Sequence, residues 1–184
     1  IVKPHASGII AEVNAIAGES YEALPEDLRG RVTVLGKDMD ESYLERVQSI
    51  MLRPELLQDE AAKKLKIVFT ALHGTGGVFV PTILTRLGFN FLTVPEQDVQ
   101  DGRFPTVKSP NPENAPALKM AVDLANKEGA DIVIGTDPDC DRMGVGVRNA
   151  AGDMELLTGN QTGALIAWYR IRTMFDLGIL NESN

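Results

Sequence analysis

The sequence lacks several features that would place it in other classes of protein. A single cysteine among 184 residues excludes an internal disulfide and favours a reducing compartment, so we expect a cytoplasmic protein. There is no run of about 18 apolar residues and no secretory signal pattern, so we expect no membrane-spanning helix. The chain also lacks an excess of positive charge. Its formal net charge of −8 argues against nucleic acid and against an anionic membrane surface as partners.

What the sequence does contain is enough apolar material for a folded core. Hydrophobic residues make up 43% of the chain, and a length of 184 residues suits one domain, or one domain with a piece of another. Because Ile1 stands where an initiator methionine would, we expect the chain to begin inside a longer protein.

The most informative stretch is residues 131–142, Asp-Ile-Val-Ile-Gly-Thr-Asp-Pro-Asp-Cys-Asp-Arg. The β-branched run 132–134 predicts a buried strand. In an extended loop after this strand, residues two apart point the same way, so Asp137, Asp139 and Asp141 can converge on one point. Such carboxylates repel by roughly 4 kcal/mol per pair at an effective dielectric near 20. A hard divalent cation such as Mg²⁺, Mn²⁺ or Ca²⁺ would remove this repulsion.

The residues between and after the aspartates refine this prediction. Pro138 keeps the loop extended before metal binds. Arg142 places a positive charge beside the site, where it suits a phosphate. Cys140 should face away from a hard ion and act as a small filler. The alternative interpretation is an acidic turn that caps a helix, with Arg142 as its salt-bridge partner.

A glycine-rich loop follows an earlier predicted strand. Residues 65–72 indicate the strand, and His-Gly-Thr-Gly-Gly at 73–77 leads into a helix over 78–87, with Pro81 expected in its first turn. The third glycine of the dinucleotide fingerprint is replaced by Phe79, which disfavours dinucleotide binding. The glycines equally suit a tight strand-to-helix turn. His73 suits either a loop-anchoring hydrogen bond or catalysis.

The remaining elements complete an alternating pattern. We expect Asn111 to cap the helix after the long loop, with Pro112 at its first position. The order βαβαββ with a final helix predicts an α/β fold, a three-layer α/β/α sandwich whose sheet is mostly parallel with an antiparallel edge hairpin. The crossover rule then places the glycine and aspartate loops at the same sheet edge. The other expected elements are helices over 6–17, 40–51, 112–127 and from about 159, strands over 32–35, 89–94, 143–147 and 154–157, and a long functional loop over 95–112.

Together these motifs resemble the α-D-phosphohexomutase superfamily, which includes phosphoglucomutases and phosphomannomutases. The aspartate loop is similar to the magnesium loop of that family. The resemblance covers nearly the whole chain and is strongest from 66 to 170. The matching motifs are Thr-Ala-Leu-His-Gly-Thr-Gly at 70–76, Phe-Pro at 104–105, Pro-Asn-Pro-Glu at 110–113, Gly-Thr-Asp-Pro-Asp-Cys-Asp-Arg at 135–142 and Leu-Thr-Gly-Asn-Gln at 157–161.

The resemblance implies a domain organisation, because such enzymes have four domains around one cleft. Residues 1–36 would be the tail of a first domain and connector, 37–160 the second domain with its metal loop, and 161–184 a helix leading to the next. The choice of Pro138 and Cys140 in the loop, with Thr-Gly-Asn at 158–160, favours the branch that resembles phosphoglucomutase-2 and phosphopentomutase enzymes.

The resemblance also implies a reaction. In such enzymes a phosphoserine donates its phosphate to a hexose phosphate, the bisphosphate reorients, and the other phosphate returns to the serine. Asp137, Asp139 and Asp141 would hold Mg²⁺ with a phosphoserine oxygen, and Arg142 would act as a catalytic positive charge. The partners would be a phosphosugar substrate and the missing domains of the parent chain.

Several parts of such an enzyme are absent from this sequence. No serine stands in the Thr-x-Ser-His-Asn setting of the family's nucleophile, and neither the sugar-selecting Gly-Glu-x-Ser-Gly loop nor the fourth-domain phosphate loop is present. We therefore expect the chain alone to be inactive. The serines are Ser7, Ser20, Ser42, Ser49, Ser109 and Ser183.

Two other interpretations remain open. In a haloacid-dehalogenase-like phosphatase the first aspartate after the strand, here Asp137, is the nucleophile, but that motif prefers Thr or Val where Asp141 stands. The chain could also be a metal- or phosphate-binding module that works alone. A Thr-x-Ser-His-Asn motif upstream of Ile1 in the parent reading frame would favour the mutase over both.

Overall fold

The computed structural model describes residues 2–18 and 22–181, and within these the chain divides into two compact units, Ile1–Asp38 and Met39–Asn184. The first unit contains helix α1 (His5–Ala15) and a single 3₁₀ turn, η1 (Glu26–Leu28), neither of which buries a side chain. The strand expected over 32–35 is wrong. Residues 32–35 form no strand and pair with no other segment, and the Val32 and Val34 side chains are each 90% exposed.

The second unit contains a five-stranded sheet in the order β2-β1-β3-β4-β5. Its strands are β1 (Lys66–Thr70), β2 (Asn90–Thr93), β3 (Ile132–Thr136), β4 (Met143–Arg148) and β5 (Met154–Leu157). β2, β1 and β3 are parallel, whereas β4 and β5 form an antiparallel hairpin at the edge. The predicted fold class, with its parallel strands and antiparallel edge hairpin, is confirmed.

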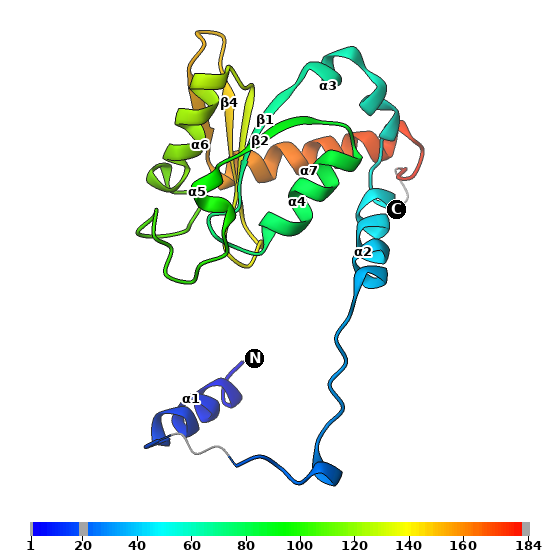
Figure 1. The fold of residues 1–184 in the computed structure, drawn as a ribbon. Helices are drawn as coiled ribbons and strands as arrows, with labels where there is room; N and C mark the ends of the chain where they lie inside the picture. The colour runs from blue at the N-terminus through cyan, green and yellow to red at the C-terminus, as the bar shows by residue number, and fades with distance from the viewer. Residues whose placement is uncertain (1, 19–21, 182–184) are drawn as a thin grey trace. The chain divides into compact units, whose positions relative to one another are not determined.

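Helices cover both faces of this sheet. Figure 1 shows α6 (Ala115–Glu128) on one side and α4 (Gly76–Arg86) and α7 (Gly159–Asp176) on the other. Alternation along β1 supplies both cores, since successive side chains of a strand point to opposite faces. Val68 packs with the alanines of α6, whereas Phe69 packs with Leu84 of α4.

The beginning of α6 differs from the prediction. The helix starts at Ala115, so the proline of its first turn is Pro116 and the capping position is Asn114. Pro112 instead lies buried over β4, where a side chain at Gly144 would collide with its backbone. The Asn111 side chain makes a tight turn by accepting the N–H of Glu113 at 3.0 Å.

Other element boundaries shift by a few residues. α4 begins at Gly76, so Pro81 lies inside the helix rather than in its first turn. The long loop opens with a short helix, α5 (Pro95–Asp98). Before β1 the chain forms α2 (Lys37–Ser49), η2 (Pro54–Gln58) and α3 (Glu60–Lys64). No helix in the described ranges is long and apolar enough to cross a membrane.

Candidate metal centre

The aspartate and glycine loops meet where the parallel strands β1 and β3 end, the edge at which α/β proteins bind ligands. Thr75, in the loop after β1, donates two hydrogen bonds to the carbonyl oxygen of Pro138. One comes from its backbone N–H at 2.8 Å and one from its hydroxyl at 3.1 Å. The two loops therefore share one edge, as the crossover rule predicts, and Gly74 is required there because a side chain would collide with Pro138.

The aspartate loop is a tight turn rather than an extended run. The Cys140 N–H donates to the Asp137 carbonyl at 3.0 Å, and Cys140 has a left-handed φ of 63°. The turn still brings one carboxylate oxygen from each of Asp137, Asp139 and Asp141 within 4.8 Å of one another. The three carboxylates converge as expected. The turn brings them together, however, and not the two-residue alternation of an extended loop.

Asp137 is the buried member of this acidic triad, with 1% of its side chain exposed. Its Oδ1 accepts the backbone N–H of Arg142 at 2.9 Å, and its Oδ2 accepts the Nε–H of the same arginine at 2.8 Å. Burial alone would raise the pKa of Asp137. The two hydrogen bonds from Arg142, with its positive charge, outweigh burial and hold the pKa below its usual value.

Asp139 and Asp141 are exposed. The pKa of Asp141 is raised, first by its hydrogen bond with Asp137 and then by the negative charge of Asp139. The triad therefore places like charges together with one arginine close by, Arg142, whose Nε lies 3.7 Å from Asp141 Oδ1. A divalent cation would relieve the remaining repulsion.

The donor set fits a hard cation. Opposite oxygens in an octahedral Mg²⁺ shell lie about 4.2 Å apart, and the ligand oxygens of the triad all lie within 4.8 Å of one another. The ligand atoms are all carboxylate oxygens, which suit Mg²⁺, Mn²⁺ or Ca²⁺ better than softer metals. Asp137 would bind the cation with a buried carboxylate whose orientation is fixed by Arg142. Asp139 and Asp141 would bind it with carboxylates at the surface.

Arg142 lies beside the triad, where it was predicted, but its guanidinium is already engaged with Asp137 through Nε. Its side chain is 52% exposed. The Cys140 thiol is not part of the triad. A side chain on Gly76, at the start of α4, would lie 3.1 Å from its sulfur, so Cys140 occupies space beside that helix.

His73 and Gln97 form a buried polar network beside the glycine loop. The ring of His73 bonds to the Val99 carbonyl through Nδ1 and to the Thr106 hydroxyl through Nε2, both at 2.9 Å. Of the two roles open to His73, the structure shows the loop-anchoring one. Sequence analysis missed Gln97, because nothing in its neighbourhood signals a buried amide.

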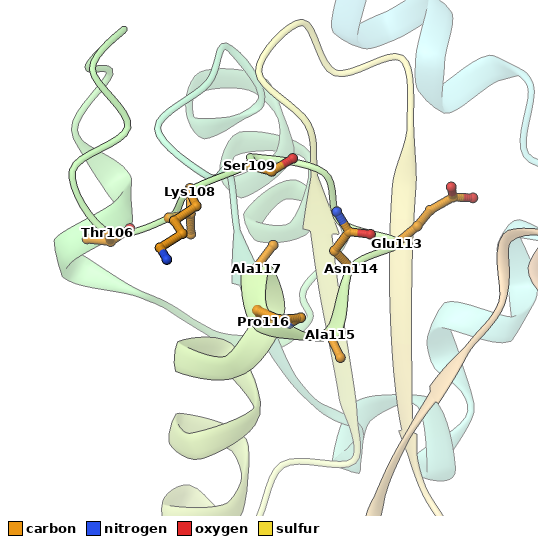
Figure 2. A pocket seen from close by; sticks show the side chains of 9 residues that line it. Thr106, Lys108, Ser109, Glu113, Asn114, Ala115, Pro116 and Ala117 are labelled. Atoms are coloured by element: carbon orange, nitrogen blue, oxygen red, sulfur yellow. The ribbon is translucent and has the colours of Figure 1, made fainter.

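A cavity of about 770 Å³ lies away from the aspartates, between segment 106–109 and the start of α6, as the side chains in Figure 2 show. Another cavity, of about 490 Å³, borders the triad through Asp139 and is otherwise mostly apolar, with Tyr43 and Phe79 in its wall. The acidic triad is therefore an open surface site with an apolar neighbour.

Comparison with known proteins gives consistent matches. The family described as phosphoglucomutase/phosphomannomutase, alpha/beta/alpha domain II, matches residues 41–152. The chain is 43% identical over 136 residues to a phosphoglucomutase of Staphylococcus epidermidis, and 41% identical over 142 residues to one of Staphylococcus aureus. These alignments cover 73% and 77% of this chain but only 24% and 25% of the relatives, so the chain spans about a quarter of their length.

A solved structure gives a more distant likeness. The crystal structure of a phosphoglucomutase/phosphomannomutase family protein from Burkholderia thailandensis is 20% identical, with a TM-score of 0.44. The match covers 67% of this chain and 29% of that one. Family membership rests on the sequence matches and not on this likeness.

Proposed function

The chain belongs to the phosphoglucomutase/phosphomannomutase family, and on that premise we propose that it is the metal-binding domain of a phosphosugar mutase. The parent enzyme would interconvert hexose 1-phosphate and 6-phosphate through a phosphoserine and a bisphosphate intermediate. The single observation that carries the proposal is the convergence of Asp137, Asp139 and Asp141 at the carboxyl edge of the parallel strands.

The roles of these residues follow from their environments. Asp137, Asp139 and Asp141 would hold Mg²⁺, which when bound offsets negative charge on the phosphoryl group in transfer. Arg142 holds Asp137 in one orientation, so the buried oxygen is presented without a search through rotamers. The rest of the Arg142 guanidinium would supply positive charge to a phosphate.

We further propose that the triad works with other parts of a longer parent chain and a phosphosugar. Residues 1–36 would close a preceding domain, 37–160 would form the metal-binding domain, and 161–184 would lead to the next, although 182–184 lie outside the described residues. Support comes from α7, whose exposed apolar side chains suit burial against further protein, with Trp168 67% exposed and Ile171 53% exposed. The choice between hexose and pentose would lie in those other parts.

The phosphatase interpretation fits the sequence less well. Its motif prefers Thr or Val at the position where this chain has Asp141. A module that works alone would not account for relatives of which the alignments cover only 24% and 25%. A phosphopentomutase-type parent would use the same triad and remains the nearest alternative.

Calorimetric titration of the purified chain with Mg²⁺ and Mn²⁺ tests the metal role. We expect weak binding, because water completes a shell that protein fills only in part. Asp139→Asn should weaken the affinity at least tenfold. The control is Asp153→Asn, an exposed aspartate in the β4–β5 turn, which should bind as the wild type does. Absence of binding, or an Asp139→Asn variant that binds normally, would contradict the proposal.

A further inference from the structure

We propose that His73 is a positioning residue for the acidic triad. It ties the loop after β2 to the end of β1 and so holds the turn that grips Pro138. The proposal rests on the metal role proposed above, because it concerns how the same site is held in place. His73 itself contacts none of the three aspartates through any bond in the described structure.

Every polar group of His73 bonds to the same segment, 97–106. Its backbone N–H donates to the Gln97 carbonyl at 3.0 Å, and its carbonyl accepts the Asp101 N–H at 3.3 Å. Its ring bonds to Val99 and Thr106. Because both ring nitrogens are engaged and the side chain is 4% exposed, the ring is not available to a substrate.

The ring of His73 belongs to a continuous network of hydrogen bonds. The Val99 carbonyl can only accept, so Nδ1 of His73 carries the proton. The amide of Gln97 donates to the Thr106 oxygen at 3.0 Å, and the same oxygen lies 2.9 Å from Nε2 of His73. The other end of the Gln97 amide accepts the Thr70 hydroxyl at 2.6 Å. The network therefore runs without a break from β1 to the loop after β2.

This network holds an unfavourable backbone. Leu72 and His73 are consecutive non-glycine residues in the left-handed region, with φ of 48° and 64°. Such residues persist only where the surroundings hold them. The bonds of His73 supply that restraint, and the next two residues are Gly74 and Thr75, which lie against Pro138.

The path from His73 to the triad is therefore short and continuous. His73 sets the turn, Thr75 donates both of its hydrogen bonds to Pro138, and Pro138 separates Asp137 from Asp139. Residues 100–102 and Pro138 also line one cavity of about 240 Å³. Removal of the His73 hydrogen bonds should therefore weaken the two bonds from Thr75 to Pro138. The three aspartate carboxylates would then lie farther apart on average.

The test uses two measurements on the purified chain. The first is amide hydrogen exchange of Thr75 in the absence of metal, and the second is calorimetric Mg²⁺ affinity. We expect His73→Ala to speed Thr75 exchange at least tenfold relative to Val68 and to weaken Mg²⁺ binding at least fivefold. His73→Asn should give intermediate values, because asparagine tolerates the left-handed region and keeps one donor for Val99.

Ile67→Ala separates positioning from a general loss of stability. Ile67 is buried at the opposite end of β1 from the triad, so this variant should be destabilised while Mg²⁺ affinity and relative Thr75 exchange stay normal. If His73→Ala does not fold, Thr106→Val can replace it, because it removes the partner of His73 Nε2 with little change of volume. We expect faster Thr75 exchange and weaker Mg²⁺ binding in this variant too.

The outcomes distinguish this inference from the proposed function. If the wild type binds Mg²⁺ and the His73 variants show normal affinity or normal Thr75 exchange, the inference is overturned and the metal role stands. If the wild type binds no divalent cation, the metal role fails, and Thr75 exchange alone then decides whether His73 holds the loop. Equal effects of Ile67→Ala would also overturn the inference.

Discussion

Arg142 holds both carboxylate oxygens of Asp137, one through its backbone N–H at 2.9 Å and one through its Nε at 2.8 Å. The same residue therefore closes the loop and neutralises its buried acid. The Asp137 N–H completes the pairing by donating to the Arg142 carbonyl at 3.3 Å. Without a metal, this pairing offsets the cost of burying the Asp137 carboxylate beside two other acidic side chains.

The first prediction is that Arg142→Ala destabilises the metal-free chain. The Asp137 carboxylate would keep the backbone bond but lose its charged partner while still buried, which costs about 1–3 kcal/mol. Urea unfolding at neutral pH measures the free energy. The control is Arg103→Ala, which removes a side chain that is 88% exposed from its pair with Asp101 and should change stability by less than about 1 kcal/mol. Equal losses in both variants would contradict a special role for Arg142.

The second prediction compares two glycines. Gly74→Ala should destabilise the chain by about 1–3 kcal/mol and weaken Mg²⁺ binding, because the new methyl group would push Pro138 and the aspartate loop away. Gly163→Ala lies in α7 with open space around it and should stabilise the helix by up to about 1 kcal/mol. Thermal unfolding with and without Mg²⁺ measures both. A Gly74→Ala variant with normal metal affinity would show that the loops are not coupled.

Much of the fold could be predicted because its strands and the end of α6 are encoded locally. The β-branched run 132–134 becomes β3, and Gly129 ends α6 in a left-handed conformation with φ of 65°. The convergence of the acidic triad was also expected from the sequence, where the three aspartates stand two residues apart after a buried strand. The turn that produces this convergence, with Cys140 in the left-handed region, could not be predicted. The hydrogen bond between Asp137 and Cys140 that defines the turn forms only in the folded loop.

The failures share one physical origin, which is tertiary context. Two asparagines near the start of α6 are each followed by a proline, Asn111 by Pro112 directly and Asn114 by Pro116 two residues on, and the sequence does not choose between them. Packing against the sheet decides where the helix starts. Because Pro112 packs over Gly144 of β4, α6 begins only at Ala115. Residues 32–35 have the composition of a strand but no partner strand. Gln97 is buried only because Thr70 and Thr106 satisfy its amide, and those partners lie 27 and 9 residues away.

The third prediction is that Asp141→Asn has opposite effects on stability and on metal binding. Removing one of three like charges should raise the melting temperature of the metal-free chain, because Asp137 and Asp139 already make ionisation of Asp141 unfavourable. The same change should reduce the rise in melting temperature that Mg²⁺ produces, since a ligand is lost. Differential scanning calorimetry with and without Mg²⁺ measures both shifts. A variant less stable than wild type without metal would argue against repulsion in the triad.

The fourth prediction concerns the loop over 98–110. Its amides should exchange faster than those of 67–70 and 132–134, because the loop carries few buried apolar side chains. Asp101 should be slower than its neighbours, since its N–H bonds to the His73 carbonyl. Hydrogen exchange resolved by residue tests this pattern. Uniform protection across loop and strands would show that the loop is packed scaffold.

The last prediction is that this chain alone does not interconvert glucose 1-phosphate and glucose 6-phosphate. The transfer needs a nucleophile, a metal and phosphate-holding groups facing one another, and proximity contributes about 7–11 kcal/mol only when all are held together. This sequence offers the triad and Arg142 but no serine in a Thr-x-Ser-His-Asn setting. In a full-length parent, Asp139→Ala should lower kcat far more than it raises KM, because the metal acts on the transition state. A coupled assay with chain and parent side by side decides the matter. Turnover by the purified chain would refute the division of labour, and a parent unaffected by Asp139→Ala would refute the role of the triad.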